Sequence, residues 1–149
     1  MITGFKKLAP QTSHTHRAAA AVAAELRRKT VLLAEDDEAV RTFAALVIHA
    51  LGYEVIQVGS AQEALALYRE RPADLLMTDL MMPAMSGKDL ADRLWRRFPM
   101  QRVLFFSGYP ERMARQRWKL DPDVAFLQKP FTSLALAKKL REMLEEPAA

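Results

Sequence analysis

The sequence contains no cysteine among its 149 residues, and its five glycines are scattered. Without cysteine the chain forms no disulfide, no thiolate metal site and no cysteine nucleophile. Without a glycine-rich loop it lacks the usual phosphate cradle of nucleotide-binding proteins. No apolar run reaches membrane-spanning length, and the alanine-rich stretch near the start is too short for a secretory signal. We therefore expect a protein that is not exported and that works in the cytoplasm.

The excess of positive charge is confined to the start of the chain. Residues 1–29 hold six Lys or Arg against one Glu, whereas residues 30–149 hold 16 basic and 17 acidic residues. Such a segment is more often a solvated extension, here with a short alanine-rich helix near 17–28, than a nucleic-acid ligand. His14 and His16 have no further candidate ligands nearby and indicate no metal site. We expect no direct DNA binding.

Half of the residues are hydrophobic and 27% are charged, as in one ordinary globular domain. From residue 30 onward, short apolar runs alternate with segments of helical periodicity. Because parallel strands need crossover connections, this alternation predicts an α/β fold of five βα units, a doubly wound open parallel sheet. The runs place the strands at 30–35, 54–58, 74–79, 102–107 and 124–128.

Apolar residues recur at helical spacing between these runs, which predicts helices that pack their apolar stripe against the sheet. The segment near 110–119 is the least apolar of them. The stripes of the first and third segments are Val40, Phe43, Ala44, Val47 and Leu51, and Leu90, Ala91, Leu94 and Phe98.

Polar side chains stand where the predicted strands end. Four acids at 35–38 follow the first strand, Asp79 ends the third, Ser107 ends the fourth, and Lys129 follows the fifth. In open α/β sheets, ligands bind outside the carboxyl ends of the strands, where the strand order reverses. We therefore expect these side chains to form one site.

The residue types at this site suggest phosphoryl chemistry. Clustered carboxylates repel one another, and a set of oxygens without His or Cys suits Mg²⁺, with Mn²⁺ as the alternative. Asp79 is then a candidate nucleophile, because carboxylates form acyl phosphates, and Ser107 and Lys129 are candidates to bind phosphoryl oxygens. The simpler interpretation is that the acids form a solvated helix-capping turn, Ser107 closes a strand and Lys129 is solvated.

Four pieces of the chain together resemble the receiver domain of bacterial two-component response regulators (CheY-like). They are "VLLAEDDEAVR", "LLMTDLMMPAMSG", "VLFFSGY" and "FLQKPF", in that order, over about residues 30 to 146. The resemblance implies a flavodoxin-like strand order, 2-1-3-4-5. It also implies that the chain is not an enzyme but a phosphoacceptor that assists its own phosphorylation and dephosphorylation. The donor is expected to be a histidine kinase or a histidine phosphotransfer protein.

The same resemblance assigns roles to single residues. Asp79 is expected to be the phosphoacceptor, Ser107 and Lys129 to bind its phosphoryl group, and Ser107 to act in the switch. Phe126 occupies the position of the switch aromatic, although it can equally be read as core. The Lys129–Pro130 bond is expected to be cis. The expected metal ligands are Glu35, Asp36, Asp79 and the backbone oxygen of Met81.

The run of acids allows two registers for the metal pair. Receivers carry an acid pair at the end of the first strand and an Arg such as Arg41 early in the next helix. Counting back from Arg41 favours Glu35 and Asp36 over Asp36 and Asp37. Asp37 is then an extra acid that suits the helix N-cap.

The resemblance divides the chain into a basic extension at 1–29, a receiver at 30–146 and a tail at 147–149, with no output domain expected. The pieces "FLQKPF" and "SGY" look most like receivers of hybrid histidine kinases. A free-standing receiver and a segment related to a hybrid kinase both stay open.

We also hypothesise a face that reads out phosphorylation to a downstream protein. It combines the segment near 110–119, the fifth strand and the last helix, with Arg112, Arg115, Trp118 and Phe126. Two other functions fit the same architecture less well. An aspartate-nucleophile phosphatase would carry a second acid two residues after the nucleophile, where this chain has Met81. A pseudo-receiver that binds partners without phosphorylation would not need every catalytic position filled.

Overall fold

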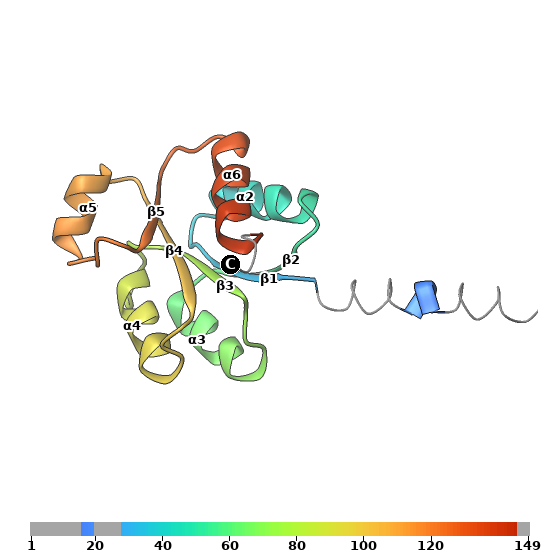
Figure 1. Cartoon of the computed structure of the whole chain (residues 1–149). Coiled ribbons are helices and arrows are strands. Elements are labelled where there is room, and N and C mark those ends of the chain that lie inside the picture. The colour runs from blue at the N-terminus through green and yellow to red at the C-terminus, as the bar shows by residue number, and fades with distance from the viewer. Residues whose placement is uncertain (1–15, 20–27, 146–149) are drawn as a thin grey trace, which may run out of the picture.

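The structure, a computed structural model, describes residues 16–19 and 28–145. Five parallel strands form one sheet in the order β2-β1-β3-β4-β5 (Figure 1). The predicted α/β fold and strand order are therefore confirmed. The elements, in chain order, are β1 (Thr30–Ala34), α2 (Glu38–Ala50), β2 (Glu54–Val58), α3 (Ala61–Glu70), β3 (Leu75–Asp79), α4 (Gly87–Arg97), β4 (Arg102–Ser107), α5 (Glu111–Arg117), β5 (Ala125–Gln128) and α6 (Ser133–Leu144).

Helices cover both faces of the sheet (Figure 1). In β1, Val31 and Leu33 pack toward α2 and α6, whereas Leu32 and Ala34 pack toward α3 and α4. Successive side chains of a strand point to opposite faces, so a run without polar residues fills both cores at once. This explains why the central strands read as continuous apolar sequence.

Side-chain caps begin α2, α3, α4 and α6 in the segments that follow the strands. Asp37 caps α2 by accepting hydrogen bonds from the backbone N–H groups of Ala39 and Val40, at 2.9 and 3.2 Å. Ser60, Ser86 and Thr132 cap α3, α4 and α6 in the same way. Each cap satisfies a backbone N–H that the first helical turn leaves unpaired. The predicted N-cap role of Asp37 is confirmed.

The outer strands of the sheet are less buried than the central ones. β2 and β5 are the two edge strands, and Glu54, Gln57 and Gln128 are exposed on them. An edge strand is covered less completely than a central one, so polar residues are tolerated there.

The ends of the chain lie largely outside the described residues. Residues 16–19 are helical, and they include the start of the helix predicted near 17–28. Residues 20–27 and the tail at 147–149 lie outside the described residues. The last helix ends at Leu144, close to the predicted end of the receiver at 146. Within the described part of the chain, no helix is long and apolar enough to cross a membrane.

Candidate functional site

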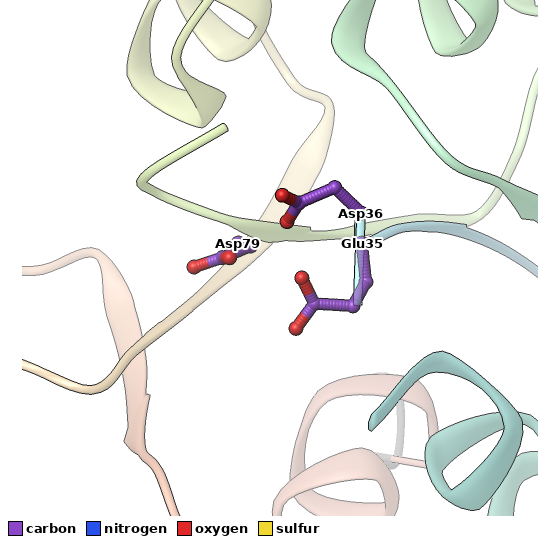
Figure 2. A group of neighbouring side chains, drawn as sticks. All are labelled: Glu35, Asp36 and Asp79. Carbon is purple, nitrogen blue, oxygen red and sulfur yellow. The ribbon is translucent and has the colours of Figure 1, made fainter. Parts of the chain in front are cut away.

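Three carboxyl groups meet at the ends of β1 and β3. Glu35 and Asp36 directly follow β1, and Asp79 is the last residue of β3, the strand that pairs with β1. One carboxylate oxygen of each residue lies within 4.8 Å of those of the other two. Glu35 and Asp79 are buried and Asp36 is exposed. Figure 2 shows the three carboxyl groups turned to the same side.

Lys129 brings a positive charge to the acids from β5. Its Nζ lies 2.6 Å from Oε1 of Glu35 and 3.2 Å from Oδ2 of Asp79. The backbone N–H of Lys129 donates to the carbonyl oxygen of Ser107 at 2.8 Å, which anchors the loop after β5 to the end of β4. The Lys129–Pro130 bond is cis, as predicted.

The pKa values of Glu35 and Lys129 are both shifted by burial and by the neighbouring charges. The pKa of the Glu35 carboxyl is raised to about 8, chiefly because the group is buried; Lys129 opposes this rise, and Asp79 and Asp36 add to it. Burial alone would lower the pKa of Lys129, but its contacts with Glu35 and Asp79 raise it above the usual value. The ammonium therefore stays charged between the Glu35 and Asp79 carboxyl groups.

Ser107 lies beside Asp79 in a small pocket. Its side chain is buried, and its Oγ accepts a hydrogen bond from the backbone N–H of Tyr109 at 3.1 Å. The pocket has a volume of about 330 Å³, and it is lined by Asp79, Met81, Ser107, Gly108, Tyr109, Pro110 and Lys129. The three residues that were predicted to handle a phosphoryl group thus share one pocket.

The remaining predicted residues lie in different settings. The backbone N–H of Met81 is 3.4 Å from Oδ1 of Asp79, which places the Met81 backbone at the site. Asp37 faces its own helix as the N-cap, and the acid group formed with Asp79 contains Glu35 and Asp36. This arrangement supports the Glu35 and Asp36 register. Phe126 is buried in the core beneath α5, as expected for a core residue.

Two residues that support the site had no assigned role in the sequence. The guanidinium of Arg41 donates to the backbone carbonyl of Glu35 at 2.8 Å and holds the acid turn in place. Gly87 packs so closely that an added Cβ would lie 2.0 Å from the carbonyl oxygen of Asp79. The sequence feature that could have indicated this role is the glycine at the start of a helix, directly after the N-cap Ser86. Glycine is favoured where two backbone segments approach closely.

Residues 31–141 match the family model of the response regulator receiver domain. The chain belongs to this family. Receiver domains are phosphoacceptor signalling modules of two-component systems, so the recognition made from the four sequence pieces is confirmed.

Relatives include both a whole protein and part of a larger one. The chain is 36% identical over 119 residues to the sensor kinase CckA of Brucella abortus, covering 78% of this chain but only 13% of that kinase. It is 32% identical over 116 residues to the response regulator receiver protein CpdR of the same organism, covering 78% of this chain and 97% of CpdR. The comparison thus includes receivers of both kinds left open by the sequence.

Solved structures show the same fold. The receiver domain of the hybrid histidine kinase CckA matches with a TM-score of 0.65 and 32% identity, over 77% of this chain and 98% of that one. The chemotaxis protein CheY4 of Vibrio cholerae matches with a TM-score of 0.70 and 26% identity, over 78% of this chain and 99% of that one.

Proposed function

We propose that the chain is a Mg²⁺-dependent phosphoacceptor that takes a phosphoryl group from the histidine of a kinase or phosphotransfer protein onto Asp79. The observation that carries the proposal is the set of groups around the buried Asp79. The carboxyl groups of Glu35 and Asp36 lie beside it, Lys129 contacts both Asp79 and Glu35, and Ser107 and Lys129 line the same pocket as Asp79. A buried nucleophile that adjoins both a group of acids suited to a cation and hydrogen-bond donors suits phosphoryl transfer.

In the proposed transfer, a carboxylate oxygen of Asp79 forms a bond to phosphorus while the bond from phosphorus to the donor imidazole nitrogen breaks. The electron pair of that bond stays on the imidazole, and Asp79 becomes an acyl phosphate. Lys129 and Ser107 donate hydrogen bonds to the phosphoryl oxygens. Glu35, Asp36, Asp79 and the carbonyl oxygen of Met81 would hold Mg²⁺, or Mn²⁺ in its place. Such an ion would neutralise negative charge on the acids and on the phosphoryl group.

An apolar surface beside the Asp79 pocket suits the docking of the donor protein. A second pocket of about 570 Å³ lies between α2 and the loop after β5, and Gly108 and Lys129 line both pockets. Phe43 and Leu46 of α2 are 40% and 64% exposed on the adjoining surface. Exposed apolar side chains at the entrance to a site are typical of a protein interface. The donor must bring its histidine to this entrance, so we propose that it docks on α2.

Replacing Leu46 with Glu is expected to slow transfer from a protein donor about tenfold or more, because it puts a charge in the apolar interface. Transfer from a small acyl phosphate should keep the wild-type rate, since Leu46 does not line the Asp79 pocket. Met113→Glu is the matched control, because Met113 is an exposed apolar residue on α5. Both rates are measured on the full chain. Equal slowing with the two donors, or no slowing with either, would rule out docking on α2.

Ser107 is the proposed link between phosphorylation and the downstream face. Its hydroxyl now accepts from Tyr109, which begins the loop into α5. Turning toward a phosphoryl oxygen would give up that bond and loosen the loop. On the face of α5, β5 and α6, Arg115 already bonds Glu111 and the carbonyl of Val124, and it lies over the Phe126 ring. A shift of α5 would therefore disturb the contacts of Arg115 with Val124 and Phe126, which lie outside that helix.

Ser107→Ala is expected to accept phosphate on Asp79 but to show a weaker conformational response, because one phosphoryl hydrogen bond is lost. Hydrogen exchange in α5 and β5, compared between the phosphorylated and unphosphorylated forms, measures that response. Ser133→Ala, at an exposed position in the first turn of α6, is the control. A fully phosphorylated Ser107→Ala variant with the wild-type exchange pattern would remove Ser107 from the switch.

A further inference from the structure

A cleft lies between α3 and α4, near the amino-terminal ends of the strands. It has a volume of about 490 Å³, and it is lined by Leu65, Tyr68, Arg69, Arg93, Leu94, Arg97 and Phe98. Figure 1 shows the two helices on the same face of the sheet. Arg69 and Phe98 precede β3 and β4, whereas Asp79 ends β3, so the cleft and the phosphorylation pocket lie at opposite edges of the sheet.

The rim of the cleft carries positive charge that the described residues leave unneutralised. Neither Arg69 nor Arg93 makes an ion pair or hydrogen bond within residues 28–145, and Arg97 only stacks on the Phe98 ring, with 5.7 Å between its guanidinium carbon and the ring centroid. No acid lines the cleft. The nearby Arg71 differs, because it pairs with Glu54. Three guanidinium groups around one cleft favour an anionic partner.

The walls of the cleft are apolar and partly exposed. Tyr68 and Leu94 are buried, and the Tyr68 ring lies against Phe98 with 5.2 Å between the centroids. Phe98 is 38% exposed, and Met100, two residues later at the tip of the turn into β4, is 90% exposed. Surfaces rich in Arg, Met and aromatic side chains are typical of protein interfaces, and the apolar area continues beyond the cleft itself. This favours a polypeptide over a small anion.

We propose that this cleft docks an acidic segment of a partner protein, with one large apolar side chain of that segment held against Leu65 and Phe98. The carboxylates of the segment would pair with Arg69, Arg93 and Arg97. The site is separate from the docking of the phosphoryl donor on α2 and does not depend on it. Because the cleft lies at the edge opposite Asp79, the segment is expected to bind whether or not Asp79 is phosphorylated.

A simpler role for these arginines is to complement the negative ends of their helices. Arg69 lies in the last turn of α3, and Arg96 and Arg97 lie in the last turn of α4. Arg96 can interact with the negative end of the helix dipole as well as Arg97 can, yet it does not line the cleft. Arg96 is therefore an internal control: it shares the helix, the charge and the exposure of Arg93 and Arg97 but does not line the cleft.

The test uses NMR titration of the full chain with three synthetic peptides. One carries a Phe flanked by glutamates, the second has Ser in place of that Phe, and the third has Gln in place of the glutamates. The first peptide is expected to shift the signals of α3, α4 and Phe98, and the other two to bind more weakly. Arg93→Glu and Arg97→Glu should each lower its affinity about tenfold or more, and Arg96→Glu less than about twofold.

Thermal unfolding of each variant checks that the substituted helix is intact. The proposal is overturned if the first peptide does not bind, or if it binds elsewhere. It is also overturned if the three Glu variants lose affinity equally, since that indicates a general charge effect. Tighter binding of ATP than of the peptide to the same residues would replace the protein partner with a nucleotide.

Discussion

The Lys129→Ala variant is expected to lose most of its phosphate incorporation and roughly 1–3 kcal/mol of unfolding free energy. Lys129 is the ammonium within hydrogen-bond distance of both Glu35 and Asp79, and both carboxyl groups are buried. Its removal leaves them without their counter-charge and takes away a donor to the phosphoryl group. Phosphate incorporation and chemical denaturation of the metal-free chain measure the two losses.

Lys138→Ala is the control for this change, because Lys138 is exposed on α6 and makes no ion pair within the described residues. It should keep both wild-type properties. If Lys129→Ala incorporated phosphate at the wild-type rate, Lys129 would be only a structural partner of Glu35.

Asp36→Asn is expected to weaken Mg²⁺ binding at least about tenfold, because it removes one of the charged oxygens of the acid group. The same change should raise the thermal midpoint of the metal-free chain by a few degrees, since it relieves repulsion between Asp36 and Asp79. Tryptophan fluorescence or NMR shifts follow the titration. Asp37→Asn is the control that keeps an N-cap side chain but changes the extra acid. Unchanged affinity in Asp36→Asn would remove Asp36 from the metal site.

The affinity for Mg²⁺ is also expected to rise with pH toward about 8. Burial raises the pKa of Glu35, so its carboxyl holds a proton over a pH range in which an exposed Glu would be charged. A bound cation must displace that proton, and affinity is therefore lost as the pH falls. In Glu35→Gln this pH dependence should be smaller.

Much of the site could be predicted because parallel strands bring their ends together. Once the apolar runs were assigned to strands, the acids after β1, Asp79, Ser107 and Lys129 had to stand on one edge of the sheet. The N-cap role of Asp37 followed from its place between a strand and a helix. These predictions depended on chain direction and needed no knowledge of side-chain contacts.

Helical periodicity failed at the residues that lie outside the core. Phe43 and Phe98 were assigned to buried stripes, but both are substantially exposed. A stripe at i, i+3 and i+4 is wider than the strip of helix that the sheet covers, so residues at its margin face solvent. Phe98 also lies past the end of α4 as its C-cap. Their exposure places Phe43 beside the phosphorylation pocket and Phe98 at the arginine cleft.

The central claim is that Asp79 accepts the phosphoryl group, and covalent labelling tests it most directly. The full chain is incubated with a small acyl phosphate and Mg²⁺, and the phosphate bound to the protein is measured by intact mass before and after acid treatment. We expect one acid-labile phosphoryl group on the wild type and on Asp89→Asn, a control at an exposed acid of α4, and none on Asp79→Asn. Equal labelling of Asp79→Asn, or no labelling of the wild type, would contradict the assignment.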